Sequence, residues 1–560
     1  MNAMLRSPSR LGMGALIGLL SAGVALGVGE LVAALVRPAA APVIAVGNRF
    51  VLATPESVKR WAIRNFGTND KHALLTGIYI GVAIFALVVG VLAAQRLAYG
   101  LAGVLLFGAI GTWAAVSDRG GRASDVIPTL VGTAAALAAM WYLHRCAGLA
   151  PTTADEDGTT RSRAKPTSTP PSSARTPTRN PSARTPAAKT AKSAPTPPST
   201  PPAPVPRRGF LTGSVALAGL AAGAGFGGRA AQHARFDVSA ARAAVRLPAP
   251  SDTGAALPAG TDLGKSGVPW QTPNNQFYRI DTALVVPQVN PTSWSLRIHG
   301  MVDREVRLSY DDLLARPLIE RWITLCCVSN VVGGGLISNA KFRGVRLADV
   351  LREAGVHPDS DQLLMTSVDQ MTIGAPTKVV MDGRDAMIAI GMNDAPLPQA
   401  HGFPARIVVP GLYGYVSACK WVVDIEATTF DQQTAYWVAG GWAQQTNIKL
   451  ESRIDTPHSH ATVPVGRPVA VAGIAWDQHV GVSKVEVQVD SGPWQEARLA
   501  TVPSTDTWRQ WVLAWTPPQA GTYTLRVRAT DASATVQTTQ AADVFPSGAT
   551  GLHTISVRAR

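Results

Sequence analysis

Two adjacent cysteines stand in the stretch 324–330, which reads Thr-Leu-Cys-Cys-Val-Ser-Asn. A short apolar run precedes Cys326 and Cys327, and three glycines follow at 333–335. We expect a strand that delivers a thiol to a turn whose backbone can approach a large ligand closely. The two cysteines are not expected to bridge, because a disulfide between neighbours strains the bond and the intervening peptide. On its own, the pair is also typical of two small buried side chains at a strand end.

The positive charge of the chain gathers in one proline-rich stretch. The formal net charge is +14, and many of the basic residues lie between 161 and 208. A basic segment beside apolar runs favours membrane topology and contact with membrane lipids, and we expect no binding to nucleic acid. Four cysteines are too few for a disulfide scaffold, and 560 residues are too many for one core, so we expect several domains with ordinary cores.

Residues 1–150 are predicted to form a membrane domain. Its apolar runs are long enough for about four transmembrane helices, over Leu11–Val36, Leu74–Ala94, Leu97–Val116 and Ile127–Leu143. Arg6 and Arg10 favour a cytoplasmic N-terminus. The segment 37–71 is strongly basic although this topology places it outside, so either it is an interfacial amphipathic piece or the helix count is wrong. Only His72 and His144 occur near these helices, which gives no support for a haem-carrying role.

A linker and an export signal are predicted next. Residues 151–206 are rich in Pro, Ser, Thr, Ala and basic residues, and they cannot bury enough apolar surface to fold. Arg207 and Arg208 then open a weakly apolar segment that resembles a twin-arginine signal or anchor over 207–229. The alternative is a fifth ordinary transmembrane helix. With either, a multi-pass protein of the cell membrane is predicted, with everything beyond Arg229 on the extracytoplasmic side.

The rest of the chain predicts two folded domains. From 230 to 453, short strands and short helices alternate in an α+β pattern; the clearest segments are strands at 294–298, 363–367 and 406–409 and a helix at 347–354. From 454 to 560 only strands follow, in a pattern typical of an immunoglobulin-like β-sandwich; we expect strands at 468–472, 482–489, 511–515, 523–528 and 553–557.

Several stretches from about Trp270 onward resemble the sulfite oxidase family of molybdopterin-dependent oxidoreductases. Cys327 and Asn330 fit the family motif T-L-x-C-x-x-N, and further matching stretches follow in the same order as in the family, at 272–278, 310–314, 342–351, 392–398, 401–411 and 414–421. Two departures are visible. Val328-Ser329 stand where the family often has Ala-Gly, and Val331-Val332-Gly333 stand where it has arginines. The missing arginines put sulfite itself in doubt as the substrate.

The resemblance implies a molybdenum–molybdopterin cofactor with Cys327 as the catalytic metal ligand. It further implies a set of cofactor-binding residues, namely Asn274, Asn275, Arg279, Asn330, His401, Arg406, Gly414, Ser417 and Lys420. Cationic and N–H donors suit a terminal phosphate, and glycines let backbone amides approach it. Each residue also has an ordinary interpretation, such as a loop histidine or a solvated lysine. Cys419 is expected to be a small buried residue, and Tyr413 and Tyr415 either face substrate or are buried in the sheet.

The implied activity is two-electron transfer of an oxygen atom to or from a small oxo-substrate, either sulfite or a sulfoxide or similar oxide. The sequence has no Cys-x-x-Cys-His haem attachment and no iron–sulfur cysteine set, so electrons must pass to or from a separate partner, a cytochrome or a quinone-linked protein. The C-terminal domain resembles a dimerisation domain, which is compatible with a homodimer.

Two other classes of function fit parts of the sequence. The first is a metal-free, membrane-tethered binding protein that keeps the fold and uses the sandwich for recognition. The second is a thiol redox protein based on Cys326 and Cys327, which would need an exposed thiol of low pKa.

Overall fold

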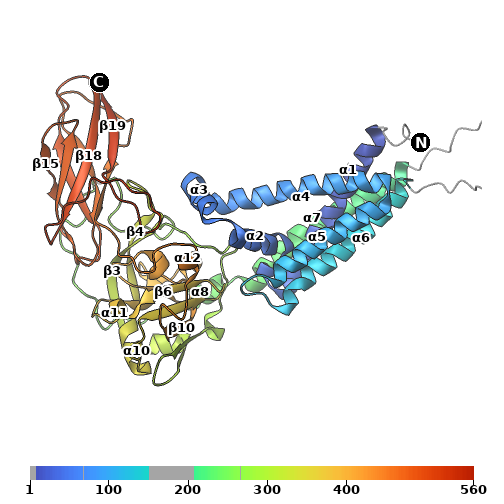
Figure 1. The fold of residues 1–560 in the computed structure, drawn as a ribbon, viewed down its shortest axis with the longest axis horizontal. Coiled ribbons are helices and arrows are strands. Elements are labelled where there is room, and N and C mark those ends of the chain that lie inside the picture. The colour runs from blue at the N-terminus through green and yellow to red at the C-terminus, as the bar shows by residue number, and fades with distance from the viewer. Residues whose placement is uncertain (1–7, 67–68, 150–206, 265–266) are drawn as a thin grey trace, which may run out of the picture.

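The computed structural model describes residues 8–66, 69–149, 207–264 and 267–560. Figure 1 shows a set of long helices, a mixed α/β body and a β-sandwich that carries the C-terminus. The predicted linker at 151–206 lies outside the described residues.

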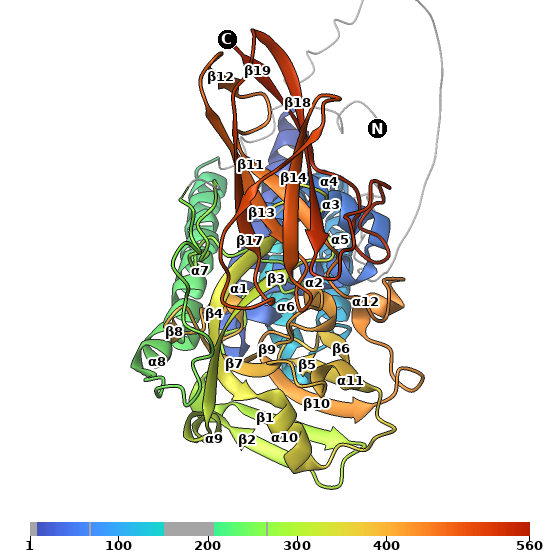
Figure 2. The ribbon, with the colours of Figure 1, turned by 90° about the vertical axis from the view of Figure 1, so that its left-hand side faces the viewer.

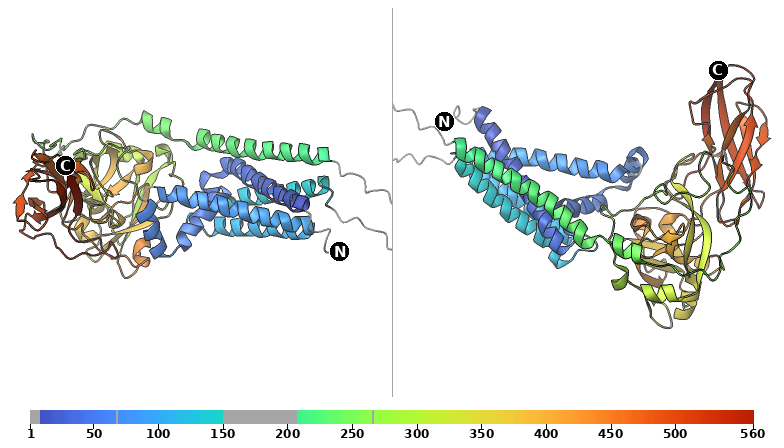
Figure 3. Two further views of the ribbon diagram at one scale, coloured as in Figure 1. Left: turned by 90° about the horizontal axis from the view of Figure 1, so that it is seen from above. Right: turned by 180° about the vertical axis from the view of Figure 1, so that it is seen from behind.

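Within the described residues, five helices are long and apolar enough to cross a membrane, namely α1 (Pro8–Val36), α4 (Asp70–Gln95), α5 (Leu97–Val116), α6 (Ile127–Cys146) and α7 (Arg207–Phe236). The first four confirm the helices predicted from the apolar runs. The fifth begins at the paired arginines and continues past Arg229 as one unbroken helix. Figure 3 shows α7 lying along the other helices.

Helix α1 is the centre of this bundle and packs against α4, α6 and α7. At the crossing of α1 with α4, Gly18 and Gly90 face each other, and a Cβ on either would overlap the opposite backbone. Small residues at such crossings let two helices pack closely. Glu30, the one charged residue within the first apolar run, accepts a hydrogen bond from Gln232 (2.9 Å) and lies 3.9 Å from Arg229. Both partners belong to α7, so this helix satisfies the only acid of α1.

The basic segment between α1 and α4 forms two further helices, α2 (Pro42–Ala53) and α3 (Glu56–Phe66). They lie between the long helices and the body (Figure 1). Lys59 donates to the hydroxyl of Tyr436 (2.7 Å), and the Arg60 guanidinium lies 4.4 Å from the ring centre of Phe545. Lys59 and Arg60 therefore contact the folded domains, whereas Arg37 and Arg49 contact Asp125 and Trp113 among the N-terminal helices.

The body is built from two five-stranded sheets. The first has the order β2-β1-β10-β5-β6, with strands β1 (Ser295–Gly300), β2 (Val306–Ser309), β5 (Gln362–Ser367), β6 (Thr372–Pro376) and β10 (Val422–Thr428). The second has the order β3-β4-β7-β8, with β9 paired to β7, and its strands are β3 (Leu318–Cys326), β4 (Ile337–Arg346), β7 (Met387–Met392), β8 (Ala395–Pro396) and β9 (Arg406–Val408). The strands predicted at 294–298, 363–367 and 406–409 correspond to β1, β5 and β9.

Short helices complete the body, namely α8 (Ser239–Ala244), α9 (Tyr310–Ala315), α10 (Leu347–Ala354), α11 (Thr377–Val380) and α12 (Tyr436–Ala439). The predicted helix at 347–354 is α10. Its residues Leu347, Val350, Leu351 and Ala354 are fully buried, the spacing that places one apolar face on a core. This helix contacts both β1 and β7, one strand from each sheet.

The sandwich follows the body directly in the chain, and Figure 2 shows its strands standing above the body. One sheet has the order β11-β13-β17-β16 and contains β11 (Glu451–Thr456), β13 (Val469–Trp476), β16 (Arg498–Leu499) and β17 (Arg509–Trp515). The other has the order β12-β19-β18-β14-β15 and contains β12 (Thr462–Val463), β14 (Val482–Val489), β15 (Trp494–Glu496), β18 (Gly521–Asp531) and β19 (Thr554–Ala559). All five strands predicted here are present, and β11 begins slightly before residue 454.

Candidate active site

Strand β3 ends at Cys326, and the two adjacent cysteines have different surroundings. Cys326 is 1% exposed and belongs to the apolar core of the body, whereas Cys327 lines a cavity. Successive side chains of a strand point to opposite faces, which separates the two thiols. All four cysteines of the chain are free. Burial raises the pKa of both thiols, and for Cys327 the hydrogen bonds of Ser329 and the charge of Lys420 act in the opposite direction.

A tight turn holds Cys327 in place. The amide of Cys327 donates to the carbonyl of Leu336 (2.9 Å), and its own carbonyl accepts from the amide of Asn330 (2.9 Å). The Asn330 side chain accepts from the amide of Leu336 (2.8 Å) and so closes the turn. Gly333 adopts a φ of 75°, which a residue with a side chain rarely adopts. The glycines after the cysteines therefore shape the loop that presents the thiol.

The C-terminal sandwich braces β3 two residues before Cys326. The amide of Thr324 donates to the carbonyl of Asp506 (2.9 Å), and the Thr324 hydroxyl accepts from the amide of Trp508 (2.7 Å). Gln478 donates to the Thr324 carbonyl (3.2 Å). Thr324 is fully buried, so its amide and carbonyl depend on these partners from the sandwich, whereas its hydroxyl also donates to Asn339 of β4 (3.1 Å).

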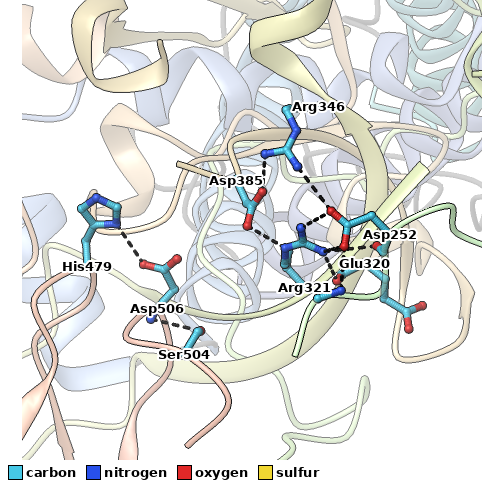
Figure 4. A network of polar contacts seen from close by, with 9 residues as sticks. Asp252, Glu320, Arg321, Arg346, Asp385, His479, Ser504 and Asp506 are labelled. Atoms are coloured by element: carbon cyan, nitrogen blue, oxygen red, sulfur yellow. Dashed lines mark hydrogen bonds and ion pairs between the residues drawn. The ribbon is translucent and has the colours of Figure 1, made fainter. Parts of the chain in front are cut away.

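Ion pairs hold the other end of β3. Figure 4 shows Arg321 between the carboxylates of Asp252 and Asp385, at 2.5 and 2.6 Å, with Arg346 in contact with the same two carboxylates. The segment before the body is thereby tied to the strand that carries the thiol. Two arginines shared by two carboxylates form a network, which fixes geometry better than an isolated surface pair.

The cavity beside Cys327 is open to solvent, and its empty space, open solvent included, is about 970 Å³. We call the residues on the side of the thiol the inner wall, and they are Tyr278, Cys327, His401, Arg406 and Lys420. Glu56, Ile63, Tyr415, Trp437 and Trp442 line the same cavity, and we call them the outer wall.

Local backbone geometry brings the basic residues of the inner wall together. His401 ends a single 3₁₀ turn, η6 (Gln399–His401), and Arg406 opens β9. Arg406 and Lys420 are directly opposite each other as an antiparallel bridge. The ring of His401 hydrogen-bonds to the backbone carbonyl of Asn274 through Nε2 (3.1 Å). Residues separated along the chain thus form one basic cluster.

The electrostatics of this cluster favour an anionic ligand. Burial, assisted by the charges of Arg406 and Lys420, lowers the pKa of His401 to about 3, and burial lowers that of Arg406 to about 10. The Nε atom of Arg406 is buried without a hydrogen-bond partner, and its guanidinium donates only to the carbonyl of His401 (3.2 Å) among the described residues. Unpaired buried cations are costly unless an anion completes them.

One carboxylate moderates this positive charge. Asp281 accepts from Lys420 (2.8 Å), lies 3.0 Å from Arg279, and also pairs with Lys71 at the start of α4. Burial lowers the pKa of Lys420 well below its usual value, and the nearby Arg406 adds to that effect. A single carboxylate thus serves three cations, and Arg406 remains available to a ligand.

The outer wall is mainly aromatic. Tyr415 and Trp442 lie 5.9 Å apart between ring centres, and Trp442 donates from its indole nitrogen to Glu56 (2.8 Å). Tyr415 also donates to the carbonyl of Ala443 (2.5 Å). Trp437 is part of α12, while Glu56 and Ile63 come from α3. The N-terminal helices therefore supply part of this cavity.

Five of the ten residues predicted for the site line the cavity, namely Cys327, His401, Arg406, Gly414 and Lys420. The remaining five have side chains engaged elsewhere or exposed. Cys419, predicted to be buried, is buried and also lines the cavity, and of the two tyrosines Tyr415 lines it whereas Tyr413 is packed in the core.

The other five predicted residues support the site from outside or lie away from it. The Ser417 hydroxyl donates to the carbonyls at 412 and 413, and the Asn274 side chain accepts from Asn393 (2.8 Å). Asn330 closes the cysteine turn, Arg279 pairs with Asp281, and Asn275 is exposed. Thus Asn274 reaches the cavity only through its carbonyl contact with His401.

Some cavity residues were not predicted. Tyr278 ends the matching stretch 272–278, so the motif already pointed to it, and Asp281 follows three residues later. Glu56 and Ile63 lie among the N-terminal helices, where the sequence carried no signal for a site.

Comparisons with known proteins agree with this geometry. Residues 283–437 match the oxidoreductase molybdopterin binding domain, and residues 451–527 match a bacterial Ig domain. Cys327, His401, Arg406 and Lys420 all lie inside the first match.

The chain is 30% identical over 280 residues to the mitochondrial sulfite oxidase of Drosophila melanogaster, covering 42% of this chain and 48% of that protein. It is 29% identical over 323 residues to the sulfite oxidase of Gallus gallus, covering 49% and 69%. A solved structure titled as the sulfane dehydrogenase SoxCD from Paracoccus pantotrophus aligns at 23% identity with a TM-score of 0.44, over 51% of this chain and 80% of that one.

The chain thus spans about half the length of the Drosophila relative. The matched part includes the thiol, the basic cluster and the cavity between them, and a soft thiolate beside buried cations suits a molybdenum–pterin with a terminal phosphate. The chain thus carries an oxidoreductase molybdopterin binding domain and is similar to the sulfite oxidases, which implies a molybdenum–molybdopterin cofactor at this site.

Proposed function

We propose that this protein is a membrane-anchored oxidoreductase that transfers an oxygen atom in a two-electron reaction on the outer face of the membrane. The observation that carries the proposal is the single cavity in which the Cys327 thiol meets the buried basic cluster. Arg406 has no ion-pair partner among the described residues, which supports an anionic ligand such as the cofactor phosphate.

Four inner-wall residues have a role in this proposal. Cys327 ligates the metal, and Arg406 and Lys420 donate hydrogen bonds to the phosphate and pterin of the cofactor. The neutral His401 donates its Nε2–H to the carbonyl of Asn274, so its Nδ1 is left as a hydrogen-bond acceptor toward the cofactor. Gly414 brings backbone close to the ligand. When bound, the cofactor supplies the two-electron redox chemistry and the exchange of oxygen, and the protein supplies orientation, charge and exclusion of water.

The five long helices are proposed to span the membrane. On α7, Val215 and Phe226 are 72% and 77% exposed, as expected for side chains that face lipid. The contacts of Glu30 with Arg229 and Gln232 favour α7 as a permanent part of the bundle, whether or not its paired arginines also act as an export signal. With a cytoplasmic N-terminus, five crossings place the body outside.

Small oxo-compounds are the proposed substrates, and a separate cytochrome or quinone-linked protein is the proposed electron partner. Among the described residues, there is no cluster of three or more His, Cys, Asp or Glu side chains that could hold a second metal. An outside carrier is therefore proposed for the two electrons.

The test is the molybdenum content of membrane-purified wild type beside Cys327→Ser and Cys326→Ser, with dye-coupled activity. We expect stoichiometric molybdenum in wild type, an altered metal-centre spectrum and lost activity in Cys327→Ser, and near-normal behaviour in Cys326→Ser because that thiol lies in the core. Protein without molybdenum, from a host that makes the cofactor, would refute the proposal and favour a binding protein.

A further inference from the structure

The outer wall combines two distant parts of the chain. Glu56 and Ile63 of α3 line the same cavity as Cys327, although they belong to the N-terminal helices. The indole of Trp442 donates to one Glu56 oxygen (2.8 Å) across 386 positions of sequence. Helix α3 therefore completes the cavity that the body begins.

Several contacts fix α3 over this opening. Lys59 donates to the Tyr436 hydroxyl (2.7 Å), and Arg60 stacks on Phe545 at 4.4 Å. From the loop after α5, Arg119 lies 3.7 Å from the ring centre of Tyr436 and donates toward the sulfur of Met371 (3.5 Å). Contacts between cations and aromatic faces stabilise such interfaces. The position of Glu56 is thus set from both sides.

The chemistry of the outer wall differs from that of the inner wall. The outer wall combines aromatic rings with the Glu56 carboxylate. Met371 and Ile373 add apolar surface to the cavity, and the carboxylates of Asp281 and Asp369 also line it. The cations that line the cavity, Arg406 and Lys420, belong to the inner wall, where the proposed function assigns them to the phosphate. Lys59 lies 3.9 Å from the second Glu56 oxygen, but it donates to Tyr436 and does not line the cavity.

This arrangement discriminates between substrate charges. A sulfite anion in the outer half would meet the Glu56 carboxylate with no cation among the outer-wall residues, and such like-charge contacts are unfavourable. A neutral sulfoxide, or an amine oxide whose nitrogen is positively charged, would instead contact aromatic faces and the carboxylate.

We propose that Glu56 and Ile63 of α3 form the substrate-binding wall of the cavity and select small uncharged or positively charged oxides over sulfite. This inference rests on the proposed function and names its substrate class. The reaction is then a reduction: the sulfur–oxygen or nitrogen–oxygen bond breaks, and the sulfur or nitrogen gains two electrons from the outside carrier. The oxygen leaves as water with two protons from solvent.

The experiment uses the full-length, molybdenum-loaded protein. Reduction of dimethyl sulfoxide and trimethylamine N-oxide is followed with a reduced viologen dye, and oxidation of sulfite with ferricyanide. Wild type is expected to have the higher kcat/KM with the oxides. Glu56→Lys should lower kcat/KM for trimethylamine N-oxide by about tenfold or more, mainly through KM, and improve sulfite oxidation at unchanged molybdenum content.

Matched variants keep the outcome decisive. Ser57→Ala changes an exposed residue of the same helix and should match wild type. If Glu56→Lys fails to accumulate, Glu56→Gln replaces it, because glutamine keeps the shape of the side chain. The quantity measured is again the ratio of kcat/KM for trimethylamine N-oxide to kcat/KM for sulfite. A wild type that contains molybdenum but prefers sulfite, or a ratio unchanged by Glu56 variants, overturns this inference alone. A wild type without molybdenum overturns the proposed function instead.

Discussion

The two walls of the cavity differ in their origin along the chain. The inner wall comes from the body between Tyr278 and Lys420, where strand ends and tight turns place each side chain. The outer wall combines Glu56 and Ile63 of α3 with Tyr415, Trp437 and Trp442 of the body. The proposed cofactor contacts thus come from one domain, whereas the proposed substrate surface also needs the N-terminal helices to pack against that domain. Substrate preference can therefore change in this fold without a change in the cofactor site.

The largest expected effect is on the inner wall. Arg406→Met removes the buried guanidinium that has no ion-pair partner among the described residues, and we expect cofactor retention to weaken by about 100-fold, roughly 3 kcal/mol. Molybdenum per chain after gel filtration measures this. Arg352→Met, at an exposed position of α10, is the control. Full molybdenum content in Arg406→Met would contradict the proposal that the inner wall holds the cofactor.

A second test concerns the packing behind the inner wall. Burial raises the pKa of Glu451, at the start of β11, to about 8. Between pH 4.5 and 8 the unfolded chain releases this proton while the folded chain keeps it, so stability falls as pH rises through that window, and above it the penalty is constant. Glu451→Gln should therefore gain stability relative to wild type by up to a few kcal/mol at pH 9 and little at pH 4.5, measured by thermal unfolding. An equal difference at both pH values would contradict the assignment.

The brace on β3 should have a similar or smaller effect. Thr324→Val keeps the side-chain shape but leaves the amide of Trp508 without its acceptor, at a cost of about 1–3 kcal/mol. We expect a lower unfolding temperature together with partial loss of molybdenum. Thr462→Val, at an exposed position of the sandwich, should change neither. If Thr324→Val is destabilised but keeps all its molybdenum, the contacts of Thr324 with the sandwich stabilise the fold without supporting cofactor binding.

A change on the outer wall should alter kinetics and leave the metal in place. Trp442→Phe keeps an aromatic ring but removes the hydrogen bond to Glu56, so we expect KM to rise about threefold to tenfold at normal molybdenum content. Steady-state kinetics and metal analysis on the same preparation test this. Loss of molybdenum here would show that the two walls do not act separately.

The smallest effect is expected at Asn275. Sequence similarity predicted a cofactor contact, but the side chain is exposed and does not line the cavity. Asn275→Ala should therefore stay within about 0.5 kcal/mol of wild type in stability and keep its molybdenum. A clear loss of molybdenum would support the predicted role of Asn275 in cofactor binding and would add this residue to the inner wall.

Local sequence patterns predicted the elements well. The apolar run at 97–116 and the helical spacing at 347–354 coincide with α5 and α10. Each pattern lies within one short segment of sequence, so it predicts the helix without any knowledge of distant contacts. The motif stretches likewise predicted the inner wall, since the turn after β3 and the bridge between Arg406 and Lys420 depend on nearby residues. No pattern of this kind exists for Glu56, whose partner Trp442 lies in another domain.

The brace at Thr324 has a consequence for the order of biosynthesis. Asp506 and Trp508 leave the ribosome long after β3, so the strand that presents Cys327 is only fully held once the sandwich has been made. We therefore expect cofactor insertion to follow synthesis of the whole chain, and nascent or truncated chains to remain empty. A host that limits cofactor supply would then accumulate complete, folded and unloaded protein.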